Sequence, residues 1–92
     1  MKNGSFCLIE GKTYVGIILI VDNMCKSANI ELLWAKKIGG GMISACFKGD
    51  LGSVVSSIER ARNFSKEKEI EMREVILSSP NYYIRKMLEE KY

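Results

Sequence analysis

The stretch "IELLWAKKIGGGMISACFKGD", residues 30–50, decides the fold predicted for this chain. Two largely apolar runs, "IELLWAKKI" and "MISACFKG", flank three consecutive glycines at 39–41. Strand-like runs joined by a short glycine segment are typical of a β-hairpin, because glycine readily adopts the positive φ that a tight turn needs. We therefore expect strands at 30–38 and 42–49. Alternation places Ile30, Leu32 and Trp34 on one face of the first strand, and Ile43, Ala45 and Phe47 on one face of the second.

The segments before the hairpin predict one strand and one helix. The run "SFCLIE", residues 5–10, is short and apolar and ends at Gly11, which predicts a buried strand. Residues 13–28 contain a β-branched cluster that favours a strand, but sixteen residues without a turn signal are more typical of a helix. We expect a helix here, with Thr13 capping its start and Asn29 supplying a left-handed cap after its end.

The segments after the hairpin predict a helix, a strand and a second, shorter helix. Asp50 is a good N-cap, and apolar residues follow it at helical spacing: Leu51, Val54, Val55, Ile58 and Ala61. Residues 69–77 predict a strand. The stretch "SSPNYY" then predicts a helix start with Ser79 as cap and Pro80 at the first helical position. Ile84, Met87 and Leu88 form the apolar stripe of this last helix.

The order of elements is β-α-β-β-α-β with a helical tail, which is the ferredoxin-like, split βαβ arrangement. The predicted class is α+β: a four-stranded antiparallel sheet with two helices on one face, plus a short C-terminal helix. We expect one domain over residues 1–92, with a core at about 5–77 and a helical tail at about 79–91. A fold of this kind does not by itself name a function.

Composition narrows the function classes. A net charge of +3, from 14 basic and 11 acidic residues scattered among one another, is too small to predict nucleic-acid or membrane binding. The N-terminal "MKNGSF" leads into an apolar run of only four residues, 6–9, and no run approaches the ~20 residues of a membrane span. We expect a soluble intracellular protein.

Catalytic and metal chemistry find little support in the residue types. The chain has no histidine, so no Ser-His or Cys-His nucleophile pair can form and an enzyme is disfavoured. Cys7, Cys25 and Cys46 are odd in number, far apart and without a C-x-x-C pair. Each lies in an apolar run, so we expect buried free thiols, a reducing compartment and no metal site.

The three glycines have two readings within a single chain. A nucleotide-binding loop is disfavoured, because the chain lacks G-x-x-x-x-G-K-[ST] and the glycines lead into a strand instead of opening a helix. A hairpin turn is favoured over an anion cradle. Three glycines still exceed the one or two that such a turn commonly uses, which suggests a demand from outside the single chain.

Four blocks of sequence carry a resemblance to a known family. They are "IEGK" at 9–12, "DNMCKSANIEL" at 22–32, "KIGGG" at 37–41 and "KGDLGSV" at 48–54. In this order and spacing, over about residues 5–77, the chain resembles the hexamer-forming shell proteins of bacterial microcompartments. Single-domain members of that family form flat six-fold discs that tile into a protein shell, so the resemblance implies a structural protein and not an enzyme.

The resemblance also implies roles for individual residues. The central pore would be formed by six copies of Lys37, Ile38, Gly39, Gly40 and Gly41, and Lys36 and Lys37 would make its approach electropositive. Lys26 would contact the neighbouring hexamer at the disc edge, where Asn29 braces the backbone, and Asp50 would brace the start of the second helix. From its residue type alone, Lys26 would be a solvated helix lysine.

Further implications concern partners and location. The resemblance implies a homohexamer in the bacterial cytoplasm, in contact with neighbouring hexamers, with other shell proteins and with encapsulated enzymes, and without nucleic acid or membrane. Some relatives hold an iron–sulfur cluster through a pore cysteine, but no cysteine lies in this loop, so we expect no cofactor.

The chain departs from the family pattern after its last predicted strand, and the predicted fold is compatible with two other functions. A family arginine near the end of the last strand is replaced by "SSP" at 78–80, which predicts weaker lateral assembly or another anchor. One alternative is a small-molecule-binding regulator with a ferredoxin-like fold. The other is an RNA-binding domain, which would need exposed strand aromatics, whereas Trp34 and Phe47 alternate with aliphatic residues and predict core positions. The shell protein is favoured over both.

Overall fold

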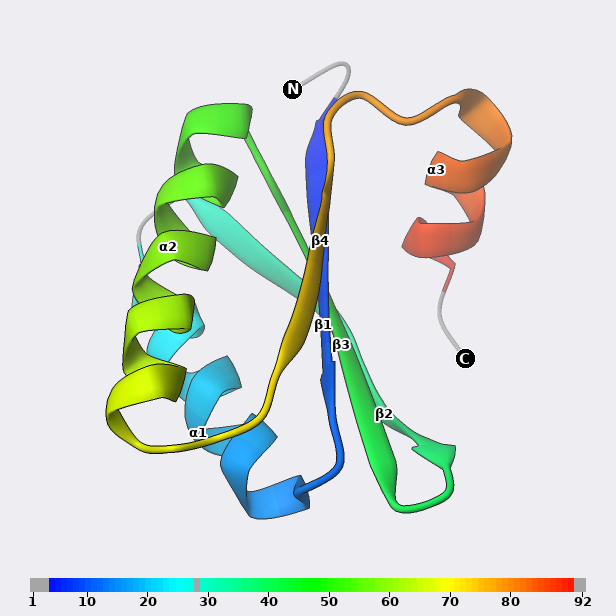
Figure 1. The fold of residues 1–92 in the computed structure, drawn as a ribbon. Coiled ribbons are helices and arrows are strands. Elements are labelled where there is room, and N and C mark those ends of the chain that lie inside the picture. The colour runs from blue at the N-terminus through cyan, green and yellow to red at the C-terminus, as the bar shows by residue number, and fades with distance from the viewer. Residues whose placement is uncertain (1–3, 28, 91–92) are drawn as a thin grey trace.

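The predicted order of strands and helices is present in the computed structural model, which describes residues 4–27 and 29–90. The elements are β1 (Ser5–Gly11), α1 (Tyr14–Cys25), β2 (Ile30–Gly39), β3 (Met42–Gly49), α2 (Leu51–Glu67), β4 (Arg73–Leu77) and α3 (Tyr82–Glu89). The strands form one antiparallel sheet in the order β2-β3-β1-β4. This order is that of the split βαβ arrangement, so the predicted fold class is confirmed. Helices α1 and α2 cover one face of the sheet and α3 lies on the other (Figure 1).

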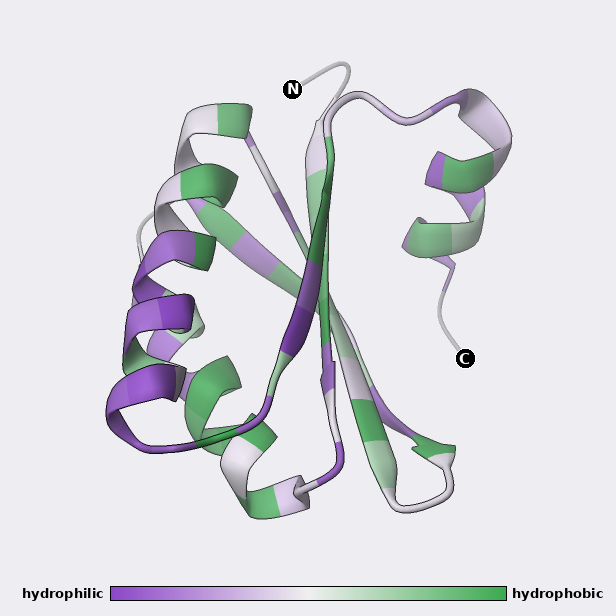
Figure 2. Cartoon of the chain, in the orientation of Figure 1, coloured by the Kyte–Doolittle hydropathy of each residue, from purple (hydrophilic) through white to green (hydrophobic). Residues whose placement is uncertain are grey.

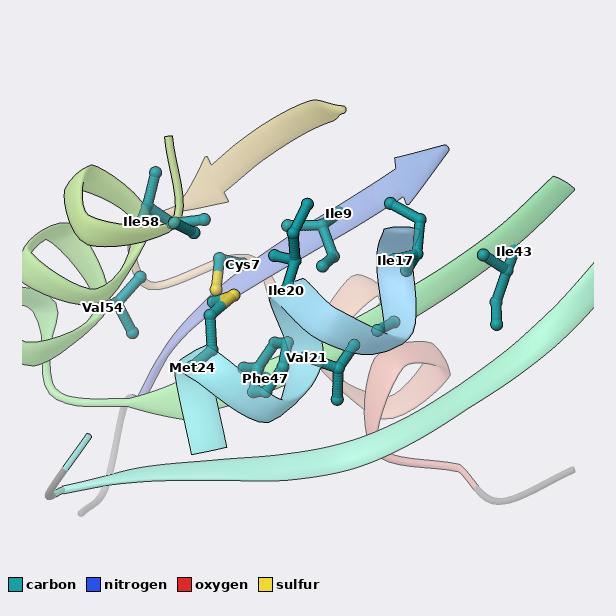
Figure 3. Packing of buried hydrophobic residues seen from close by; sticks show 12 residues of the cluster. Cys7, Ile9, Ile17, Ile20, Val21, Met24, Ile43, Phe47, Val54 and Ile58 are labelled. Atoms are coloured by element: carbon teal, nitrogen blue, oxygen red, sulfur yellow. The ribbon is translucent and has the colours of Figure 1, made fainter. Parts of the chain in front are cut away.

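The main core lies between the sheet and the α1–α2 layer. Figure 3 shows side chains from both helices and from the strands meeting there, with Met24 of α1 next to Phe47 of β3. Both of these residues are fully buried, as are Ile17 and Ile20 of α1. Burial of large apolar side chains on this scale is what holds the two helices against the sheet.

A second, smaller core lies under α3. Leu88 packs against Phe6 and Cys46 on the opposite face of the sheet. The indole Nε1 of Trp34 donates a hydrogen bond of 2.8 Å to the backbone carbonyl of Leu88. The Lys48 ammonium forms an ion pair with the Glu89 carboxylate. The hydrogen bond that it donates in this pair lowers the pKa of the Glu89 carboxyl. The tail helix is therefore attached to the domain by apolar and polar contacts together.

The apolar stripe predicted for α3, formed by Ile84, Met87 and Leu88, is only partly present. Leu88 is buried and Ile84 is half-buried against the second core, but Met87 is exposed. An eight-residue helix lying on one sheet face presents only a narrow strip of its surface to that face.

A β-bulge in β2 overturns the predicted alternation of its side chains. Leu32 pairs with Phe47, and Trp34 pairs with Cys46. Between these two pairs the chain moves two residues along β2 but only one residue along β3. The extra residue, Leu33, shifts the side chains of residues 34–37 to the other face. Ile30 therefore packs against the main core, whereas Trp34 packs against the second core, and the prediction that they share a face is wrong.

The predicted start of β4 at residue 69 is also wrong, because the end of α2 occupies those residues. The Ile70 amide donates to the Ser65 carbonyl at 2.8 Å, and the Glu69 amide donates to the Lys66 carbonyl at 3.2 Å. Glu69 has a φ of 57°. Together these features are a Schellman motif, which usually has glycine at the left-handed position. Because glutamate occupies this position, the sequence contains no glycine that would mark the end of α2.

Asn81 caps α3 in place of Ser79. The Asn81 side chain accepts a hydrogen bond of 3.0 Å from the Ile84 amide, and its backbone is extended as an N-cap requires. Ser79 has a φ of 53°, which is incompatible with the cap position. Pro80 consequently precedes the cap instead of opening the helix. The helix bounds of 79–91 are corrected to Tyr82–Glu89, with residue 91 outside the described residues.

Helix α1 ends earlier than predicted. Its last residue is Cys25 and its C-cap is Lys26, so Asn29 does not cap it. Asn29 does have a left-handed φ of 67°, and it turns the chain into β2. Residue 28, the predicted end of the helix, lies outside the described residues. Thr13 is the N-cap residue as predicted, although its side chain makes no capping hydrogen bond.

Candidate pore loop and edge residues

The three glycines form the turn of the β2–β3 hairpin. Gly39 pairs with Met42, which leaves Gly40 and Gly41 as a two-residue turn. All three glycines have positive φ, of 97°, 61° and 78° in sequence order. A turn with positive φ at both central residues matches the right-handed twist of the strands it joins. The predicted hairpin turn is thus confirmed, and the single chain already explains all three glycines.

The tip of this hairpin projects away from the rest of the chain. A Cβ atom added to any of the three glycines would meet no atom within 4 Å. Ile38, next to the turn, is exposed, and a second register shift in β2 lies at this residue. The backbone of residues 38–41 is therefore accessible to other molecules or to other copies of the chain.

The two lysines that precede the turn lie on opposite faces of the sheet. The Nζ atom of Lys37 lies 5.1 Å from the centroid of the Tyr14 ring, at the start of α1. The Nζ atom of Lys36 lies 5.4 Å from the centroid of the Trp34 ring, on the face that carries α3. Both distances suit a cation–π contact. Positive charge is therefore present on both sides of the hairpin.

Lys26 lies at the other end of α1. Its Nζ atom is 3.1 Å from an Asp22 carboxylate oxygen, and both side chains are largely exposed, so the pair adds little stability. The twelve residues of α1 span about 18 Å at 1.5 Å per residue. Tyr14, beside the hairpin, begins the helix and Lys26 follows its end. The structure thus separates the candidate pore residues from the candidate edge residues.

Asn29 and Asp50 lie close together, on either side of Gly49. A Cβ atom at Gly49 would lie 2.6 Å from the Asn29 carbonyl oxygen, so only glycine permits this approach. Asp50 accepts hydrogen bonds of 2.9 Å from both the amide and the hydroxyl of Ser53. These bonds lower the pKa of the Asp50 carboxyl. The structure shows Asp50 as the N-cap of α2, and the Asn29 backbone lies against the same corner.

The cysteines only partly follow the expectation of buried thiols. Cys7 and Cys46 are buried, and burial raises the pKa of each thiol to about 12. Cys25 is exposed, because the last residue of α1 faces away from the sheet, so the prediction is wrong for this residue. Within residues 4–27 and 29–90, no group of three or more histidine, cysteine or acidic side chains is placed to hold a metal ion. Nor does any helix in this part of the chain have the length and apolar character to span a membrane.

Sequence reasoning did not identify the contacts that position these residues. The Lys37–Tyr14 and Trp34–Leu88 contacts join segments far apart in the chain, and neither has a local sequence signal. A polar recess between the end of α1 and the start of α2 was missed as well. Its serines are spread over both elements and read as ordinary surface residues.

Comparison with known proteins identifies the class. The profile of the BMC domain matches residues 5–80. The bacterial microcompartment shell protein PduA of Citrobacter freundii is 28% identical over 92 residues, covering 96% of this chain and 95% of the relative. PduA of Salmonella typhimurium is also 28% identical, covering 96% of this chain and 94% of the relative. The shell protein EutM of Escherichia coli is 37% identical over 46 residues, about half of each chain.

A solved structure supports the same fold. A microcompartment protein from Desulfitobacterium hafniense superimposes with a TM-score of 0.78 at 23% identity, covering 94% of this chain. The present chain spans 47% of the length of that protein, about half. Fold and matches together define the class of bacterial microcompartment shell proteins, whose role is structural. The chain belongs to the BMC-domain family.

Proposed function

We propose that six copies of this chain close into a flat ring, with the β2–β3 hairpins around a central pore and Lys26 at the outer rim. The ring tiles with neighbouring rings and with other shell proteins into a microcompartment shell in the bacterial cytoplasm, where it encloses enzymes and performs no chemistry of its own. The observation that carries this proposal is the placement of the candidate pore and edge residues at opposite ends of α1.

The shape of the chain supports a flat ring. Its principal extents are 35 × 27 × 17 Å, so it is a slab about half as thick as it is long. Because α1 runs from the hairpin to Lys26, the helix would lie along a radius of the ring, between the axis and the rim. The outer face of α1 is therefore the surface at which neighbouring copies would meet.

The composition of α1 supports that position. Figure 2 shows α1 coloured hydrophobic over most of its length, in contrast to the later turns of α2, which are mostly hydrophilic. Val15 is 67% exposed and Leu19 is 46% exposed, and Ile18 lies beside them on the same helical face. A helix that is apolar all round is normally buried on all sides. A second copy of the chain would cover this face and close the ring without leaving an open edge.

The charges near the hairpin support a selective pore. Lys36 and Lys37 lie on opposite faces of the sheet, so a ring would carry six copies of each lysine, one set on either side of the opening. A narrow opening with cations at both mouths raises the local concentration of anions. The pore would favour small anionic or polar metabolites, with exposed glycine backbone at its narrowest point.

The edge assignment is tested by reversing the charge of Lys26. We expect Lys26→Asp to leave a ring of about six times the 10.4 kDa chain mass in light scattering, while sheets or tubes disappear from electron micrographs. The change removes the lysine stem from the lateral contact and places a carboxylate near Asp22, at the end of α1 that lies at the proposed rim. Lys68→Asp is a matched control, because Lys68 follows the end of α2 and should not affect tiling. Sheets that persist unchanged in Lys26→Asp would refute the edge assignment.

A further inference from the structure

A polar recess lies between the end of α1 and the start of α2. It has a volume of about 430 Å³, and its lining includes Lys26, Ser27, Asp50, Ser53, Ser57 and Arg60. A water molecule occupies about 30 Å³ in the liquid, so the recess has room for a small ion together with several waters. It is formed within one chain and does not depend on the proposed ring.

One serine that lines this recess has no hydrogen-bond partner among the described residues. Ser57 is only 2% exposed, yet it lines the recess, and none of the hydrogen bonds among the described residues involves its side chain. The hydroxyl of Ser65, on the same helix, does donate to the Arg62 carbonyl at 2.8 Å. The Ser57 hydroxyl is therefore directed at the recess, where it can bond to water or to a bound ligand.

Two cations border the same space. Arg60 reaches from α2 to donate a hydrogen bond to the Ser27 hydroxyl beyond the end of α1, which fixes its guanidinium at the wall of the recess. Lys26 lies on the adjoining wall. Gly52, in the first turn of α2, also lines the recess, and the Asp50 side chain accepts a hydrogen bond from the Ser53 amide and not from that of Gly52. Guanidinium, ammonium, hydroxyl and amide groups are together the donors that bind oxyanions.

The Asp50 carboxylate determines which oxyanion fits. Its lowered pKa keeps it charged at neutral pH, and each of its oxygens can still accept another hydrogen bond beyond those from Ser53. Sulfate has no proton to offer and would be repelled. Hydrogen phosphate carries an O–H that can donate to Asp50 while its other oxygens accept from Arg60, Lys26 and Ser57. We propose that this recess is a binding site for phosphate, in which Arg60 holds the charge and Asp50 selects the protonated oxyanion.

The test is a titration of the full-length protein with inorganic phosphate at constant ionic strength, followed by backbone-amide chemical shifts. We expect saturable shifts at Gly52, Ser53 and Ser57, and much smaller shifts with sulfate at equal concentration. Arg60→Gln should weaken phosphate binding about tenfold, as expected for loss of a charge-assisted hydrogen bond. Arg62→Gln is the matched control, because Arg62 pairs with Glu74 outside the recess and should leave the affinity unchanged.

A second variant tests whether Asp50 is the residue that selects phosphate over sulfate. Asn is as good an N-cap as Asp, so Asp50→Asn should keep α2 intact while it removes the repulsion of sulfate. We expect this variant to bind sulfate about as well as phosphate. The proposal is overturned if phosphate and sulfate give equal shifts in the unmodified protein, if the shifts do not saturate, or if folded Arg60→Gln binds phosphate as well as Arg62→Gln does. Should Arg60→Gln fail to fold, Ser57→Ala takes its place, with the same expected direction.

Discussion

Replacing Leu19 with aspartate is expected to break the ring into single chains. Leu19 is 46% exposed on the outer face of α1 and is not part of either core, so the isolated chain should fold normally. In the proposed ring the new carboxylate would be buried without a partner at each of six identical interfaces. An unpaired buried charge costs about 3–5 kcal/mol at each contact, enough to reduce association by more than about a hundredfold. Light scattering should show the mass of one chain, with an unchanged circular-dichroism spectrum.

The chain offers a closely matched control for this change. Leu51 is 45% exposed, almost as much as Leu19, but it opens α2 at the Lys26 end of the molecule. An acidic side chain is favourable at a helix N-terminus, so Leu51→Asp should fold as well as the unmodified chain and keep the ring. If Leu51→Asp dissociates the ring and Leu19→Asp does not, the interface lies elsewhere than on α1.

The second large effect is expected from a charge placed at the hairpin tip. Gly40 has a φ of 61°, a conformation that Asp and Asn tolerate better than other non-glycine residues. Gly40→Asp would put six carboxylates around the proposed opening, against the lysines on either side. We expect passage of a small carboxylate solute into assembled shells to fall about tenfold or more, because six carboxylates at the narrowest point repel anions and offset half of the lysine charge.

Gly40→Asn is the control that distinguishes the effect of charge at residue 40 from the effect of side-chain size. Its side chain has nearly the shape of aspartate without the charge, so it should slow anionic and neutral solutes to a similar, smaller degree. Both variants have open space at the turn in the single chain, so neither should disturb the fold. Equal passage of the carboxylate solute through Asp and Asn shells would show that charge at residue 40 does not control entry, and that the hairpin does not line the pore.

The parts of the fold that could be predicted are those with a strong local signal. The hairpin was predicted because three glycines interrupt strand-like runs, and α2 because Asp50 precedes apolar residues at helical spacing. The errors arose where tertiary packing, and not the local sequence, determines which way a side chain points or where a helix ends. The bulge at Leu33 turns Trp34 toward α3, and the Schellman end of α2 uses Glu69 where glycine would have marked it.

For the candidate site, the roles of individual residues could be predicted but their arrangement in space could not. The roles of Lys26 and the glycine loop followed from resemblance to a family, not from the residue types, since a lone exposed lysine reads as a solvated side chain. Their separation by the length of α1 could not be predicted, because it depends on the contact of Tyr14 with Lys37 across the fold. The recess containing Ser57 and Arg60 has no sequence signature, since its residues come together only when α2 packs beside α1.

The most direct test of the proposed ring is a reconstruction of the purified protein by electron cryo-microscopy, viewed along the symmetry axis. The account predicts six copies, with Gly39, Gly40 and Gly41 of each lining a central opening and Lys26 at the outer rim. A ring with another number of copies, or one with residues 38–41 at its periphery, would contradict it.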